Sequence, residues 1–281
     1  MSALIGLLMV ILLASLLLVL AGVIRLAGGR FPSDAHGFLW QAIGLWTGCM
    51  LCLVLWLLDG PRHVLVLALP SVAGCCWLLS LLMAERTRHG METGDVRIAG
   101  LVPRRASRYV ARWAPTVMRA SFLAAVCLSL TAILLASAHD PRAYSATWAD
   151  GTLRTHGPWP GWPYAVPALL GLAVGWMLAE VVMRLVVDRA PASRHAPADD
   201  GLRMLSARAA LTAACIVSLP TLAALLLAMG ASFHSAAPSG LLRSAGWAMI
   251  AFGGLLGLTA SAAWLAALLS GGRAVLARPK A

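Results

Sequence analysis

Long runs of apolar residues, separated by short polar segments, dominate the chain. A bilayer core of about 30 Å is crossed by about 20 helical residues, which rise about 1.5 Å each. Seven apolar stretches have this length: residues 3–24, 38–58, 64–84, 116–138, 164–187, 207–230 and 245–269. The pattern predicts an all-α, polytopic bundle of seven transmembrane helices, which forms a single transmembrane domain over residues 1–281.

Two of the connections between these expected helices are long. In residues 85–115, arginines recur at every fourth position opposite an apolar side, which predicts a short amphipathic helix lying on the membrane surface. The side chains that this helix would offer to lipid or to a protein partner are Arg104, Arg105, Arg108, Arg112 and Trp113. Residues 139–163 form the other long connection, which is rich in Trp and Pro: Trp and Tyr rings favour the headgroup level, and the prolines stiffen the chain before the next helix.

The positions of Lys and Arg predict the orientation of the bundle. Of the 22 basic residues, 18 fall on alternate connections and in the C-terminal tail, and four fall on the other side. Because positive charge resists translocation, we expect the N-terminus and residues 139–163 outside, and residues 85–115 and the C-terminus in the cytoplasm. Residues 3–24 could instead be a cleaved signal peptide, but no positive segment precedes them, and that alternative would reverse every later helix.

Composition agrees with a membrane protein. Hydrophobic residues make up 60% of the chain and charged residues 12%, with a mean hydropathy of +0.82, which excludes an ordinary soluble domain. The net charge of +11 then indicates contact with anionic lipid headgroups at the cytoplasmic face rather than with nucleic acid. Lys280 is the single lysine beside 21 arginines, a bias typical of GC-rich bacterial genomes, so we expect a bacterial plasma (inner) membrane.

Three short segments carry a resemblance to a known group. Residues 101–110 (LVPRRASRYV), residues 158–162 (PWPGW) and the pair Val166-Pro167 together resemble a pattern of actinobacterial polytopic membrane proteins. The resemblance implies a membrane location. It implies no catalytic residue, because the group has no assigned activity.

Four cysteines form a first candidate site. Cys49 and Cys52 lie one turn apart on the second expected helix, and Cys75 and Cys76 lie on the third. Facing thiol pairs could act as a redox relay or bind a soft metal. All four lie deep in the hydrocarbon, where a thiol is a small packing residue, so we expect no metal and favour packing.

Glu180 is a second candidate because no other carboxylate lies within the seven apolar stretches. Placing an ionisable group at membrane depth costs free energy, which suggests that such a group has a functional role. Arg184 follows at i+4 and can pair with Glu180, while Arg119 could reach the same level from the fourth helix. A structural ion pair and a substrate- or proton-linked role both remain open.

Glycines spaced four residues apart recur on three expected helices and let helix backbones approach closely. These are Gly44 and Gly48, Gly171 and Gly175, and Gly253 and Gly257. They predict packing within the bundle or, alternatively, the face of a homodimer or of a partner membrane subunit.

Several functions lack the residues that they need. The seven histidines lie in connections or at helix edges, which argues against haem ligation, and no helix offers a lysine for a Schiff base. The motifs of zinc proteases, P-loop proteins and serine hydrolases do not occur. We therefore expect no cofactor and a non-enzymatic role, with a transporter-like or transporter-accessory bundle as the leading hypothesis. The alternatives are a scaffold or sensor that docks through its Arg-rich connection, and a membrane-embedded enzyme.

Overall fold

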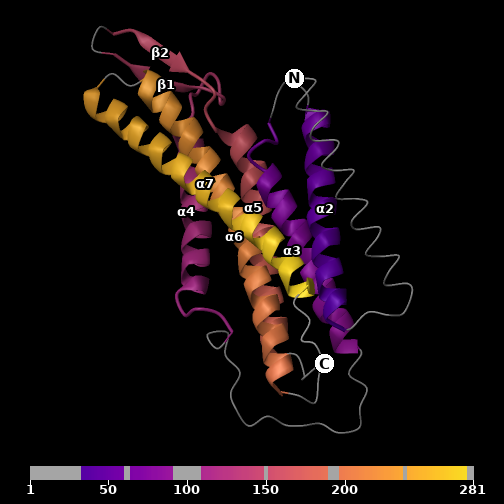
Figure 1. Cartoon of the computed structure of the whole chain (residues 1–281). Helices are drawn as coiled ribbons and strands as arrows, with labels where there is room; N and C mark the ends of the chain where they lie inside the picture. Colours follow the sequence, from indigo (N-terminus) through magenta and orange to yellow (C-terminus); the bar gives the residue numbers. More distant parts are fainter. Residues whose placement is uncertain are drawn as a thin grey trace.

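The structure, a computed structural model, describes residues 33–59, 64–90, 109–148, 151–188, 196–236 and 239–276. The described chain is a bundle of six α-helices with one β-hairpin (Figure 1). The elements are α2 (Ser33–Asp59), α3 (Leu69–Gly90), α4 (Ala114–Leu134), β1 (Tyr144–Thr147), β2 (Leu153–His156), α5 (Trp162–Asp188), α6 (Ala196–Ala236) and α7 (Gly240–Leu276). The first expected span, residues 3–24, lies outside the described residues.

Five of the described helices are long and apolar enough to cross a membrane. Their spans are Leu39–Asp59, Ala114–Leu134, Trp162–Asp188, Asp200–Ala236 and Gly240–Ala262. Helices of this length and composition indicate a multi-pass membrane protein, so that part of the sequence prediction is confirmed.

The third expected span, residues 64–84, differs from the structure. Residues 64–68 form turns, and the backbone amide of Leu65 donates a 2.7 Å hydrogen bond to Asp59 Oδ2, which tightens the connection after α2. α3 begins at Leu69, and Pro70 then occupies its first turn, where the missing N–H is not needed. Because α3 continues to Gly90 through a polar last turn, it is not among the five apolar spans.

The connection at residues 139–163 contains secondary structure that the hydrophobic pattern did not predict. β1 and β2 pair antiparallel, with Tyr144 opposite His156 and Thr147 opposite Leu153. The indole nitrogen of Trp148 donates a 3.1 Å hydrogen bond to the carbonyl oxygen of Ala236, which ties the hairpin to the end of α6. The all-α prediction is therefore corrected by one small hairpin at one end of the bundle (Figure 1).

α6 is the central helix of the described bundle. It packs against α3, α4, α5 and α7, and six of its buried residues are alanines, which allow close helix approach. The hydroxyls of Ser121 on α4 and Ser218 on α6 lie 2.8 Å apart in this core, so one donates to the other, and the accepting hydroxyl donates to a carbonyl of its own helix. Polar groups within the core thus find partners across the α4–α6 contact.

Side-chain contacts bring four helix termini together at the end of the bundle opposite the hairpin. Ser206 on α6 contacts Glu85 near the end of α3, and Arg203 on α6 contacts Val186 near the end of α5. Arg119 near the start of α4 contacts Glu180 on α5. We call this the charged end. The Arg-rich connections after α3 and α5 both leave from it, whereas the hairpin lies at the other end.

Candidate functional site

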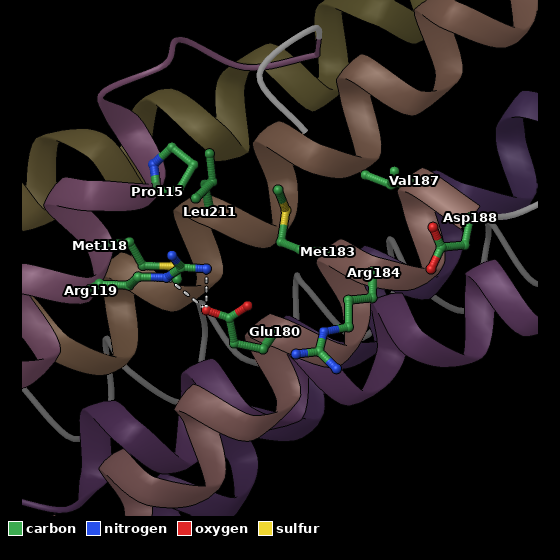
Figure 2. A pocket seen from close by; sticks show the side chains of 9 residues that line it. All are labelled: Pro115, Met118, Arg119, Glu180, Met183, Arg184, Val187, Asp188 and Leu211. Carbon is green, nitrogen blue, oxygen red and sulfur yellow. Dashed lines mark hydrogen bonds and ion pairs between the residues drawn. The ribbon is translucent and has the colours of Figure 1, made fainter. Parts of the chain in front are cut away.

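An ion pair between α4 and α5 lies at the charged end. Glu180 Oε1 accepts two contacts of 2.9 Å from Arg119, one from Nε and one from Nη2 (Figure 2). The sequence favoured Arg184 as the partner, one turn along the same helix, and offered Arg119 as a second possibility. The structure instead gives Glu180 its partner on the neighbouring helix, so the pair links two helices.

The depth of Glu180 follows from the start of α5. Glu180 lies 18 residues after Trp162, or about 27 Å along the helix axis, against a hydrocarbon core of about 30 Å. The carboxylate is therefore close to one boundary of the apolar core. The side chain of Arg119 is 56% exposed and that of Glu180 is 23% exposed. The pair is thus half-open to its surroundings rather than sealed in the protein.

A cleft of about 300 Å³ surrounds this pair. Arg184 and Asp188, both exposed, line it one and two turns beyond Glu180 on α5 (Figure 2). Its remaining lining is apolar and comes from α4, α5 and α6. The cleft therefore holds two guanidinium groups and two carboxylates in an otherwise apolar setting, an arrangement that can bind a charged or dipolar group.

A second charged cluster is buried next to the cleft, and the sequence did not reveal it. Glu85 is 2% exposed, and Ser206 donates a 2.6 Å hydrogen bond to its Oε1. Arg203 is fully buried and donates from Nη1 to the carbonyl oxygens of Val186 and Val187, at 2.8 and 3.0 Å. These contacts hold the ends of α3 and α5 against the start of α6.

The hydrophobic pattern places Glu85 and Arg203 in cytoplasmic connections, because Glu85 follows the apolar run 64–84 and Arg203 precedes the run 207–230. The helices extend past those runs, so Glu85 and Arg203 lie within α3 and α6. The available signal was the continued helical spacing of small and apolar residues around Arg203, such as Leu202 and Ala207.

The Arg-rich connection is only partly within the described residues. Arg104, Arg105 and Arg108 lie outside them, so the expected amphipathic helix stays a prediction there. The described part, residues 109–113, is not helical: it forms turns before α4 begins. Arg112 and Trp113 are exposed, while Tyr109 is buried and its hydroxyl lies 3.4 Å from Asp200 Oδ1.

The four cysteines lie on α2 and α3 as free, half-buried thiols. The thiol of Cys52 donates to the carbonyl oxygen of Leu69 at 3.0 Å, and that of Cys75 to the carbonyl oxygen of Gly171 at 3.6 Å. Within the described part of the chain, no group of three His, Cys, Asp or Glu side chains is placed to hold a metal ion. Two of the four thiols therefore contact the backbone of a neighbouring helix.

The spaced glycines face neighbouring helices. A Cβ atom at Gly44 would clash with Ser80 on α3, and one at Gly48 would lie 2.9 Å from the Cα of Ala73. On α5, a Cβ at Gly171 would clash with Ser71, and one at Gly175 would lie 2.6 Å from Val217 Cγ1. On α7, Gly253 lies against Ala223 and Leu226 on α6, whereas Gly257 has ordinary space, with the nearest atom at 3.8 Å.

The Trp-Pro segment differs in part from the expectation that its aromatic rings lie at the headgroup level. Trp159 is fully buried and its indole nitrogen donates a 2.7 Å hydrogen bond to the carbonyl oxygen of Ala132. Its ring packs against those of Tyr144 and Phe233, with centroids 5.0 and 5.3 Å away. Trp162 is 58% exposed, as the interfacial role requires. Trp159 is therefore an anchor of the hairpin rather than a headgroup contact.

Comparison with known proteins adds no assignment. No protein-family model matches the chain, and no curated protein and no solved structure is significantly similar to it.

Proposed function

We propose that this protein is a transporter-like helix bundle of a bacterial plasma membrane, or the membrane subunit of a transporter, and that Glu180 binds and releases a proton in its cycle. The proposal includes seven spans, with the N-terminus outside and the charged end in the cytoplasm. The distribution of Lys and Arg supports this orientation, since the two most basic connections leave the bundle from the charged end.

The observation that carries the proposal is the pairing of Glu180 with Arg119 across two helices at the wall of a cleft. A carboxylate whose only task was to neutralise a neighbour could use Arg184 on its own helix. Instead the pair joins α4 to α5 where solvent or a ligand can reach both groups. Intramembrane ionisable residues that line a cavity are typical of ion and proton pathways.

Protonation of Glu180 supplies a switch in this arrangement. The ionised carboxylate attracts the guanidinium of Arg119 and so favours contact between the two helices. Once a proton neutralises Glu180, that attraction is lost and Arg119 is free to turn toward a ligand or toward water. A charge change at one residue thereby biases two arrangements of α4 and α5, which is the requirement for coupling a proton to a conformational change.

Proton flux into liposomes tests the proposal. The full chain is reconstituted into vesicles that contain a pH-sensitive dye, and a pH step is imposed outside while valinomycin and potassium clamp the membrane potential. We expect faster internal acidification than in protein-free vesicles. Glu180→Gln should abolish the increase, because the amide cannot carry the proton, and Glu180→Asp should keep part of it.

Arg208→Gln is the matched control. Arg208 is an exposed arginine on α6 near the charged end, and it does not line the cleft. Its replacement should leave the flux unchanged. The proposal is wrong if the wild-type protein gives no increase over empty vesicles, or if Glu180→Gln retains the full flux.

A further inference from the structure

A second hollow follows the seam between α4 and α5, directly beyond the ion-pair cleft. Its volume is about 470 Å³ and its lining is entirely apolar. α4 contributes Phe122 and Val126, and α5 contributes Val166, Leu170, Ala173 and Trp176. Phe122 follows Arg119 by one turn, and Trp176 precedes Glu180 by one turn, so the groove and the cleft are consecutive along the same two helices.

The two hollows together match an amphiphile, because the charged cleft can hold a headgroup and the apolar groove can hold an acyl chain. From Trp176 to Val166 the groove spans 10 residues of α5, or about 15 Å, which matches the roughly 15 Å that half of a bilayer core occupies. An acyl chain that starts at the cleft can therefore lie along the groove for the depth of one leaflet. The edge-to-face contact of Phe122 with Trp176, with centroids 5.4 Å apart, borders the groove at the cleft.

The charges of the cleft select the headgroup. Two arginines and two carboxylates line it, so its formal charge is balanced. An anionic headgroup would add a net negative charge to this balanced cleft and would leave Glu180 and Asp188 without a cationic group of the ligand to pair with. A zwitterionic headgroup offers a phosphate to the guanidinium groups and an ammonium to the carboxylates, and so matches all four.

The geometry of the ion pair leaves room for such a ligand. Both contacts from Arg119 end on Oε1 of Glu180, so within the described residues Oε2 remains available to accept a hydrogen bond from a ligand. Arg184 lies on the other side of Glu180 and does not share this pair (Figure 2). A primary ammonium can donate to Oε2 while Arg184 holds the phosphate; a quaternary ammonium has no N–H and cannot make the first contact.

We infer that the seam between α4 and α5 binds a zwitterionic phospholipid with a primary ammonium, namely phosphatidylethanolamine, with its headgroup in the Arg119–Glu180 cleft and one acyl chain in the apolar groove. This inference names the ligand class of the cleft, and to that extent it rests on the proposed function. The lipid enters sideways from the membrane, because both hollows open on the outer surface of the described helices, where Leu170 and Arg119 are exposed.

Native mass spectrometry of the delipidated full chain tests the inference. The protein is exposed in detergent to an equimolar mixture of phosphatidylethanolamine, phosphatidylcholine and phosphatidylglycerol with identical acyl chains. We expect occupancy by phosphatidylethanolamine to exceed that by either competitor by a factor on the order of ten, which corresponds to about 1.4 kcal/mol.

Variants assign the two parts of the lipid to the two hollows. Glu180→Gln should remove the preference over phosphatidylcholine, and Arg184→Gln should lower the occupancy of all three lipids, because all three carry the phosphate. Ala173→Trp should fill the groove and lower all three equally. The matched controls are Arg208→Gln and Ala124→Trp, which alter an exposed arginine and an exposed alanine outside both hollows.

Three outcomes would overturn the inference: a preference for phosphatidylglycerol, equal occupancy by all three lipids, or a preference that survives Glu180→Gln together with occupancies that Arg184→Gln and Ala173→Trp do not lower. The result is separable from the proposed function. Selective lipid binding without proton flux would disprove the transport proposal alone, and Glu180-dependent flux without lipid preference would disprove the lipid inference alone.

Discussion

Arg203 on α6 donates a 2.8 Å hydrogen bond to the carbonyl oxygen of Val186, which lies in the last turn of α5. The last carbonyls of a helix have no partner within it, and a cation there also interacts favourably with the helix dipole. Since the guanidinium is fully buried and also contacts the carbonyl of Val187, it fixes the end of α5 to the start of α6.

Arg203→Ala should therefore destabilise the bundle strongly. The change removes charge-assisted hydrogen bonds and leaves buried carbonyls unpaired, at a cost of about 3 kcal/mol in the free energy of unfolding. The melting temperature in detergent, followed by size-exclusion chromatography after heating, measures the loss. Arg208→Ala, at an exposed position of the same helix, should shift it little. Equal shifts for both variants would contradict the role given to Arg203.

The Arg119–Glu180 pair should contribute little to stability, in contrast to Arg203. Exposed pairs are screened by their surroundings, and the 56% exposure of Arg119 places this pair among them. A double-mutant cycle with Arg119→Gln and Glu180→Gln should give a coupling energy below about 1 kcal/mol. All variants of the pair should then fold, and any loss of flux would report on function. A coupling energy of several kcal/mol would instead make the pair a structural element.

Gly44 should tolerate no side chain, because α2 and α3 are in close contact there. Gly44→Leu places side-chain atoms into Ser80 and toward the carbonyl oxygen of Cys76, and the overpacking should cost about 1–3 kcal/mol. Gly254→Leu on α7 is the control, since a Cβ there meets nothing within 4 Å. Both melting temperatures are measured in the same detergent. The packing argument fails if the two variants melt alike.

Trp159 should anchor the hairpin. Trp159→Ala removes a fully buried indole and its bond to Ala132, which should lower the free energy of unfolding by about 3 kcal/mol. The exposed Trp162 provides a matched change to alanine with a small expected effect. Limited proteolysis between β1 and β2 reports on the hairpin directly. Cleavage should accelerate in Trp159→Ala and should not accelerate in Trp162→Ala.

The helices themselves could be read from the sequence because lipid imposes a simple rule on length and polarity. The apolar runs at residues 38–58, 116–138 and 164–187 correspond to α2, α4 and α5, with ends that differ by a few residues. The start of α3 could not be read, because residues 64–68 are as apolar as the helix that follows. The hairpin was missed because its strands have four residues each and no sustained alternation.

The candidate site could be predicted in part. Glu180 and Arg119 were visible as charges within apolar surroundings, but the choice between Arg119 and Arg184 depends on how α4 and α5 face each other. Glu85 and Arg203 were hidden because a charge just outside an apolar run has the pattern of an ordinary solvated connection. Their burial is a property of helix packing, and local spacing does not contain it.

The orientation of the bundle can be tested by cysteine labelling in intact cells. Leu153 is exposed on β2 and Arg112 is exposed just before α4, so they mark the hairpin end and the charged end. In a background where the six native cysteines are replaced by alanine or serine, each position is changed to cysteine in turn. A membrane-impermeant maleimide should label Leu153→Cys from outside and should label Arg112→Cys only after the cells are opened, because positive charge retains the charged end in the cytoplasm. The reverse pattern would place the Arg-rich connections outside and invert the proposed topology, and with it the side from which Glu180 receives its proton.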